Sequence, residues 1–291
     1  MKRAYKVVDV FTKTPLLGNP VAVVLDADGL DTKTMQAIAS WTNLSETTFL
    51  LPPTKPQADY RLRIFTPKHE LPFAGHPTLG SAHAALEAGR AVPRNGVLVQ
   101  ECGVGLVELA VEGDGANRTL SFAVPPAKLT PLNPAQIERL EGILGATVER
   151  KIIPMIVDMG VVWIVAQLSS ASKVLALRPD FGRSAAFEHS LGATGITVFG
   201  PHETDDAQIE VRSFACSQGV QEDPVCGSGN ASVAVFRQEL GLLPKGRNDY
   251  TATQGHCLGR AGRIAVHIHA GDGQITIGGQ CVTAVDGVLK T

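Results

Sequence analysis

Hydrophobic and polar residues alternate along several short stretches of the chain, a pattern that predicts strands with one buried face. Residues 60–65 (Tyr-Arg-Leu-Arg-Ile-Phe) and 209–214 (Ile-Glu-Val-Arg-Ser-Phe) show it clearly. Residues 105–111 and 262–268 alternate in the same way. Four further stretches are apolar runs of strand length: 21–25, 46–51, 161–168 and 196–199.

Two longer segments predict helices that follow a glycine turn and end at a second glycine. Pro77 suits the first position of a helix, so His76 is the predicted N-cap of the first helix. Ser228, a preferred capping residue, occupies the corresponding place in the second. Gly89 and Gly241 are natural helix ends. The residues between are mostly apolar, as expected for two buried helices.

The same order of elements occurs twice in the chain. Residues 74–78 (Ala-Gly-His-Pro-Thr) precede residues 226–230 (Cys-Gly-Ser-Gly-Asn) by 152 positions, and Gly89 precedes Gly241 by the same number. Short glycine-bounded helices also match by chance, but several matched features in one order favour a duplication. The sequence therefore predicts an α+β protein of two pseudo-symmetric domains, each a curved, mostly antiparallel sheet or barrel around a central helix.

The predicted boundary between the domains is a proline-rich stretch from Pro125 to Pro131, before a helix capped by Asn133 with Pro134 in its first position. The domains are predicted as residues 1–128 and 129–291. The last strand, about residues 281–289, is expected to pack back on the first domain.

Composition narrows the class of protein. The chain has 291 residues, of which 44% are hydrophobic and 19% charged, which is ordinary for a globular protein. A net charge of −2 gives no reason to expect binding to nucleic acid or to an anionic membrane. No apolar run reaches the roughly 18 residues of a membrane helix, and no signal-peptide pattern opens the chain. A cytoplasmic location is therefore expected.

The five cysteines are scattered and odd in number, a pattern that does not indicate a disulfide framework. No C-x-x-C or H-E-x-x-H motif is present in the sequence, so we expect no metal site.

The two predicted helix starts suggest a binding site for a small carboxylate. A helix N-terminus presents unpaired backbone N–H groups, and two such ends facing each other would hold an anion. Gly75 and Gly227 would let a substrate approach the backbone closely. Glu46, at the start of an apolar strand, would have a raised pKa if desolvated and would then suit proton transfer. Asp223 lies just before the second helix.

Each of these residues also has a structural interpretation. Glu46 would be a solvated residue at a strand start, Asp223 a turn former before Pro224, and His76 a helix cap only.

Five segments together resemble the phenazine-biosynthesis isomerase (PhzF-like) family. They are Gly18-Asn19-Pro20, Leu44-Ser45-Glu46-Thr47, Phe73-Ala74-Gly75-His76-Pro77-Thr78, Glu222-Asp223-Pro224-Val225-Cys226-Gly227-Ser228-Gly229 and Gly278-Gly279. The resemblance extends over nearly the whole chain, from about Tyr5 to Leu289. It implies the diaminopimelate-epimerase-like fold, an active site between two domains, a homodimer, a small carboxylate substrate and no cofactor.

The resemblance also implies roles for individual residues. In the family's characterised enzyme a glutamate moves a proton between two carbons of a dihydro-3-hydroxyanthranilate, and that glutamate corresponds to Glu46. The supporting catalytic residues correspond to His76 and Asp223. The implied substrate-binding residues are Ser45, Gly75, Cys226, Gly227 and Ser228.

Cys226 departs from the family pattern, which usually has threonine there. Related two-thiol racemases carry a catalytic cysteine at this place, but their second thiol corresponds to Ala74. A thiol at a helix N-terminus would have a lowered pKa. Three alternatives therefore stay open: a racemase or epimerase using Cys226 with Glu46 or Asp223, a hydrolase using Cys226 and His76, and a non-catalytic binder of small carboxylates.

Overall fold

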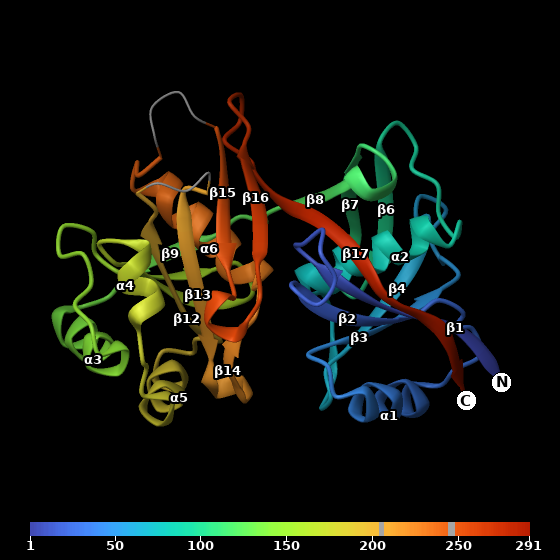
Figure 1. Cartoon of the computed structure of the whole chain (residues 1–291), viewed down its shortest axis with the longest axis horizontal. Helices are drawn as coiled ribbons and strands as arrows, with labels where there is room; N and C mark the ends of the chain where they lie inside the picture. The colour runs from blue at the N-terminus through green and yellow to red at the C-terminus, as the bar shows by residue number, and fades with distance from the viewer. Residues whose placement is uncertain (204–206, 244–247) are drawn as a thin grey trace. The chain divides into compact units, whose positions relative to one another are not determined.

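The computed structural model describes residues 1–203, 207–243 and 248–291 and divides the chain into two compact units. Unit 1 comprises Met1–Ala123 and Gly278–Thr291, and unit 2 comprises Val124–Ile277. Each unit combines a mixed sheet with a buried helix, so the predicted α+β class is confirmed (Figure 1). Among the described residues, no helix is long and apolar enough to cross a membrane.

Unit 1 contains most of the first half of the chain and the end of the last strand. Its elements are β1 (Lys2–Val10), β2 (Asn19–Val24), α1 (Thr32–Thr42), β3 (Thr47–Leu51), β4 (Tyr60–Phe65), β5 (Glu70–Leu71), α2 (Gly75–Glu87), β6 (Val97–Cys102), β7 (Gly105–Glu112), η1 (Gly115–Asn117), β8 (Thr119–Ala123) and most of β17 (Ile275–Lys290). Residues 281–290 of β17 pair antiparallel with β1, from Lys2 to Val10.

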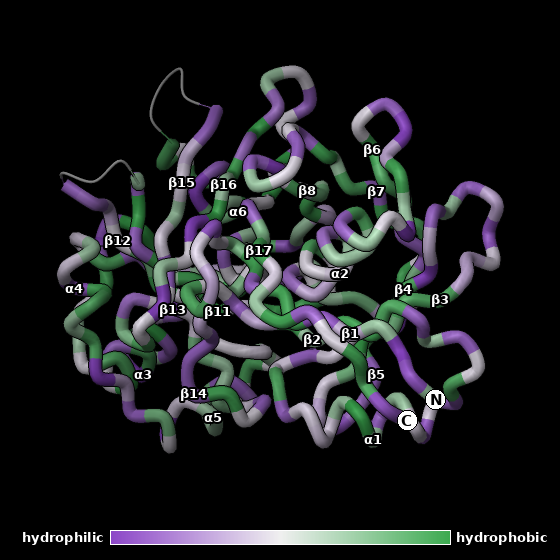
Figure 2. The backbone as a smooth tube through the Cα atoms, turned by 45° about the vertical axis from the view of Figure 1, so that its right-hand side comes forward, coloured by the Kyte–Doolittle hydropathy of each residue, from purple (hydrophilic) through white to green (hydrophobic). Residues whose placement is uncertain are grey.

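Helix α2 is the centre of unit 1, and β1, β2, β3, β4 and β8 all contact it. A side chain at Gly80 would collide with Val21 and Val10, so this glycine lets the helix lie directly on β1 and β2. Figure 2 shows apolar residues in β3, which ends with Phe-Leu-Leu. Two polar groups on this surface pair with each other: the hydroxyls of Thr48 and Ser81 are 2.8 Å apart. Pairing is needed there because an unsatisfied polar group in a core costs about 1–3 kcal/mol.

Unit 2 repeats this plan with additional helices on its outside. Its elements are β9 (Lys128–Pro131), α3 (Pro134–Leu144), β10 (Met155–Asp158), β11 (Val162–Gln167), α4 (Ala171–Ala176), α5 (Phe181–Ser190), β12 (Gly195–Pro201), β13 (Ile209–Ala215), η2 (Cys216–Gln218), β14 (Val220–Asp223), α6 (Gly227–Glu239), β15 (Asp249–Gln254), η3 (His256–Leu258), β16 (Gly262–Ile268) and the first residues of β17. Helix α3 begins with the predicted Asn133 cap and with Pro134 in its first position.

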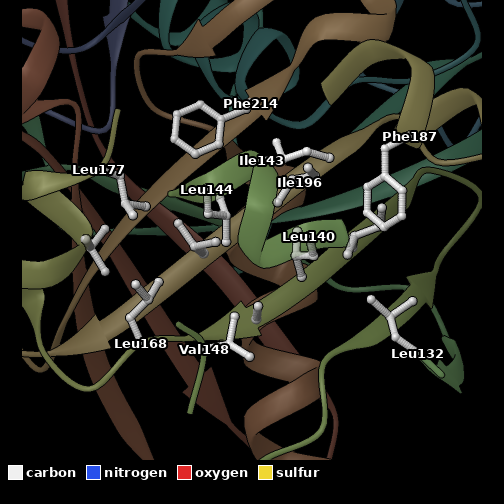
Figure 3. Close-up of a cluster of buried hydrophobic side chains, with 14 of the residues drawn as sticks. Leu132, Leu140, Ile143, Leu144, Val148, Leu168, Leu177, Phe187, Ile196 and Phe214 are labelled. Atoms are coloured by element: carbon white, nitrogen blue, oxygen red, sulfur yellow. The ribbon is translucent and has the colours of Figure 1, made fainter. Parts of the chain in front are cut away.

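Helix α6 is the central helix of unit 2 and contacts β10, β11, β12 and β16. Gly229 in its first turn permits this packing, since a side chain there would meet the hydroxyls of Ser213 and Thr197. A separate apolar cluster lies between the outer helices and the sheet. Figure 3 shows Leu140, Ile143 and Leu144 of α3 near Phe187 of α5 in this cluster.

The two units share one order of strand pairings, as the sequence repeat predicts. In unit 1, β2–β3 is parallel, β3–β4 antiparallel, β4–β6 parallel and β6–β7 antiparallel. In unit 2, β11–β12, β12–β13, β13–β15 and β15–β16 follow the same sequence of directions. Gly89 and Gly241 directly follow the C-cap residues of α2 and α6 with φ of +64° and +63°. The predicted pseudo-symmetry and helix ends are therefore confirmed.

The predicted helix caps were wrong by two residues. Ala74 is the N-cap of α2 and Cys226 is that of α6, so His76 and Ser228 both lie in the second helical position. Pro77 accordingly occupies the third position. Proline is tolerated there because the first N–H groups of a helix have no partner within the helix. The predicted caps therefore lie inside the first turn.

Candidate active site

Glu46 and His76 meet within unit 1. Glu46 lies in the short connection between α1 and β3, and His76 lies in the first turn of α2. Nε2 of His76 is 3.2 Å from a carboxylate oxygen of Glu46, and both side chains are largely buried, with 8% and 15% exposed. The main chain holds Glu46 in place, since its carbonyl accepts a hydrogen bond from the Ala22 amide of β2.

The imidazole of His76 is neutral at ordinary pH. Burial lowers the pKa of His76 to about 3, and a hydrogen bond to the backbone of Pro20 only partly opposes this effect. Nδ1 of His76 lies 3.5 Å from the side-chain nitrogen of Asn19. His76 therefore lies beside Glu46 as a neutral group and not as a counter-ion.

The other predicted residues of unit 1 flank this pair. Ser45 is exposed and precedes Glu46. Gly75 is the first residue of α2, and the ring of Phe122 is 3.0 Å from the place where its side chain would begin. A larger residue at position 75 would have to displace this ring.

Asp223 ends β14, three residues before the N-cap of α6. Its carboxylate accepts a hydrogen bond of 3.1 Å from the Val225 amide. Burial raises the pKa of Asp223 to about 6, although hydrogen bonds from Val225 and the Cys226 thiol lower it. Asp223 therefore changes its protonation state close to neutral pH.

The neighbouring acid, Glu222, has a different environment. It forms a two-point ion pair with Arg212 of β13, at 2.9 and 2.7 Å, and both side chains are buried. Arg212 also donates to the carbonyl oxygens of Val174 and Leu177. The pair ties β14 to β13 and to the end of α4, and so fixes the strand that carries Asp223.

Cys226 caps α6 with its sulfur, which accepts a hydrogen bond of 3.3 Å from the Gly229 amide. The expected lowering of its pKa is wrong: burial, and then the charge of Asp223, raises the pKa of the Cys226 thiol well above its ordinary value. Desolvation disfavours a thiolate more than the helix end favours it. The cysteine is therefore a buried, protonated capping group.

Gly227 and Ser228 are the first two residues of α6. The Ser228 hydroxyl is 3.6 Å from the Cys226 sulfur and accepts a hydrogen bond of 3.1 Å from the indole nitrogen of Trp163. Asp223, Cys226 and Ser228 thus form one linked group within unit 2.

Sequence reasoning missed Gln254, which holds this group together from β15. Its side-chain oxygen accepts hydrogen bonds from the Cys226 amide at 3.1 Å and from the Asn230 side chain at 2.7 Å. Its side-chain nitrogen donates to the carbonyl of Asp223 at 2.9 Å. The only available signal was a glutamine in the last position of an otherwise ordinary strand.

Within the described ranges, no group of three or more His, Cys, Asp or Glu side chains is arranged to hold a metal ion.

The chain was then compared with known proteins. The model of the family described as "Phenazine biosynthesis-like protein" matches residues 8–287. The chain belongs to this family. Antisense-enhancing sequence 1 of Schizosaccharomyces pombe is 41% identical over 98% of both chains. The trans-2,3-dihydro-3-hydroxyanthranilate isomerase of Pseudomonas aeruginosa is 35% identical over 89% of this chain and 88% of its own.

Structural comparison agrees with the family. The phenazine biosynthesis protein of the PhzF family from Bacillus anthracis superposes with a TM-score of 0.88 and 22% identity, and the match covers 100% of both chains. The fold predicted from the sequence is thereby confirmed as that of the PhzF family. Its relatives of named activity place this chain in a family of isomerases and epimerases.

Proposed function

We propose that this chain is a cofactor-independent isomerase that moves a proton within a small carboxylic acid, with Glu46 as the group that carries the proton. The observation behind this proposal is the buried contact between Glu46 and a neutral His76. A side chain that transfers a proton must be held in one place and partly shielded from water. Glu46 meets both conditions.

In the proposed step, the Glu46 carboxylate removes a proton from a carbon of the substrate, and the same carboxyl group returns a proton to a second carbon. The double bond moves accordingly, and substrate and product have the same composition. Nε2 of His76 lies 3.2 Å from the Glu46 carboxylate, so the neutral ring places no cationic charge beside this base. A protonated His76 would instead form an ion pair and weaken Glu46 as a base.

We propose that unit 2 supplies groups that bind the substrate. The Gly227 and Ser228 amides at the start of α6 and the Ser228 hydroxyl would donate to a carboxylate or to the negative charge that develops during proton removal. Asp223 would accept from an amine or hydroxyl of the substrate. In unit 1, Ser45 and the Gly75 amide would contribute in the same way.

The racemase and hydrolase alternatives both need a reactive thiolate at position 226. Burial and the neighbouring Asp223 charge raise the pKa of Cys226, which opposes formation of a thiolate. We therefore assign Cys226 a capping role and no step in the chemistry. The relative from Pseudomonas aeruginosa is named for trans-2,3-dihydro-3-hydroxyanthranilate. We propose as substrates small unsaturated acids that carry an amine or a hydroxyl beside the carboxylate.

A substrate screen in D₂O tests this proposal. Purified enzyme is incubated with trans-2,3-dihydro-3-hydroxyanthranilate and with a panel of small unsaturated acids, and mass spectrometry detects deuterium gained at carbon. We expect enzyme-dependent uptake of one deuterium by at least one acid, and an isomer of the same composition. A protein that binds acids from the panel without any exchange would be a binding protein, and the proposal would be wrong.

A further inference from the structure

Trp163 of β11 is bonded to Ser228 in a way that decides what Ser228 can bind. The indole nitrogen of Trp163 donates to the Ser228 hydroxyl oxygen over 3.1 Å. Indole is a donor only, so the serine oxygen must accept in this contact. Its single proton is then left to point at another acceptor.

The surroundings of Trp163 keep this contact in place. Trp163 is only 2% exposed, so water does not compete for its N–H group. In the sheet, Trp163 is paired with Gly195 of β12. A side chain at Gly195 would come within 2.7 Å of the Trp163 ring, so the glycine provides the space that the indole occupies.

One acceptor near the serine proton is a sulfur atom. Within the described part of unit 2, the Cys226 sulfur lies 3.6 Å from the Ser228 oxygen, and sulfur is a weak acceptor. A carboxylate oxygen or an oxyanion is a stronger acceptor and would take the proton from the sulfur. A ligand that only donates hydrogen bonds could use only the second lone pair of the serine oxygen and would leave the serine proton on the weak sulfur acceptor.

We propose that Trp163 is a positioning residue that fixes the Ser228 hydroxyl as a hydrogen-bond donor, and that this makes Ser228 selective for an anionic acceptor group of the ligand. This inference rests on the proposed function only in placing Ser228 in the substrate site. It assigns Trp163 no contact with the reacting atoms. Gly195 has the further role of making room for the indole.

The hydrogen bond can be tested without any turnover. The chain has two tryptophans, so a ¹H–¹⁵N spectrum carries two indole signals, and a Trp41→Phe variant identifies that of Trp163. We expect Ser228→Ala to move the Trp163 indole proton upfield and to leave that of the exposed Trp41 unchanged. An unchanged Trp163 signal would overturn the proposal.

The selectivity is tested by calorimetry with 3-hydroxyanthranilate, a stable aromatic acid that carries a carboxylate, an amine and a hydroxyl. The four proteins of a double-mutant cycle are wild type, Trp163→Phe, Ser228→Ala and the double variant. We expect Trp163→Phe to weaken binding about fivefold to tenfold in the wild type and less than about twofold in the Ser228→Ala background. 2-Aminophenol, which lacks the carboxylate, is the matched control and should respond to neither change.

Additive effects of the two substitutions would show a structural role only and overturn the proposal. Failure of 3-hydroxyanthranilate to bind the wild type would also overturn it, because the site would then not select an acid of this kind. Glu46→Gln should leave unchanged both the indole signals and the coupling between Trp163 and Ser228 that the double-mutant cycle measures. A failure of this inference is therefore distinguishable from a failure of the proposed proton transfer.

Discussion

Nε2 of His76 lies 3.2 Å from a carboxylate oxygen of Glu46, and burial keeps the imidazole neutral. The two residues are 30 positions apart in the chain and come from a loop and a helix start. Glu46 directly precedes β3, and His76 lies in α2. Strands β2 and β3 are parallel neighbours that both contact α2, and this packing brings the two residues together. The candidate base is therefore positioned by the core of unit 1.

The buried His76 should make the protein sensitive to acid. Its pKa is about 3 in the folded protein and near 6.5 when unfolded, so its contribution to stability is complete above pH 6.5 and is lost as pH falls toward 3. Replacing His76 by Asn removes this dependence. Denaturant unfolding at a series of pH values should show the wild type losing about 3 kcal/mol relative to His76→Asn between pH 6.5 and 4. Parallel curves would contradict a buried neutral imidazole.

Asp223 should give the pH profile of catalysis its acidic limb. Its pKa is raised to about 6, so it is a carboxylate above this pH and protonated below it. If the carboxylate accepts from the substrate, kcat/KM should fall about tenfold for each pH unit below 6. The Asp223→Asn variant should have low activity and no inflection near pH 6. A wild-type inflection that persists in Asp223→Asn would assign it to another group.

The Cys226 thiol should be replaceable and unreactive. Cys226→Ser preserves a small polar cap, so we expect kcat/KM within about threefold of wild type, whereas Cys226→Ala should cost about 1 kcal/mol of unfolding free energy. Iodoacetamide should alkylate the exposed Cys257 and leave Cys226 unmodified, as peptide mass spectrometry would show. Rapid alkylation of Cys226 with loss of activity would contradict this prediction and would support a racemase or hydrolase mechanism that uses a Cys226 thiolate.

Gln254 should matter to both folding and activity. Gln254→Met removes the partners of Cys226, Asn230 and Asp223 at once, and we expect a loss of about 2–4 kcal/mol and a lower kcat/KM. The matched control is Gln100→Met in unit 1, where the buried glutamine donates to Thr78 of the central helix. Thermal unfolding and kinetics on both variants separate a loss of stability from a loss of kcat/KM. A Gln254→Met enzyme with unchanged kcat/KM would show that the segment from Asp223 to Cys226 keeps its conformation without this residue.

Much of the fold could be predicted because its signals are local. Alternating apolar positions mark β4 and β13, and Gly89 and Gly241 mark the ends of the two central helices. The starts of these helices were placed two residues late. Pro77 is compatible with any of the first helical positions, so a proline alone does not identify the N-cap.

The candidate site was predictable only in part, for physical reasons. Glu46, His76 and Asp223 occur in motifs with a recognisable spacing. The pKa of Cys226 depends on burial and on Asp223, neither of which the helix position reveals. Trp163 and Gln254 reach the site from strands that are distant in sequence. Such contacts arise from sheet register, which a single sequence does not specify residue by residue.

The most direct test of the account is the rate at which Glu46→Gln incorporates solvent deuterium into a substrate that the wild type labels. Glutamine has nearly the same shape but does not accept the proton, so we expect exchange to fall by at least about 100-fold while the Kd of the substrate changes little. Glu108→Gln, at an exposed glutamate of unit 1, should match the wild type. Exchange by Glu46→Gln at a rate near that of the wild type would contradict the assignment of Glu46 as the proton carrier.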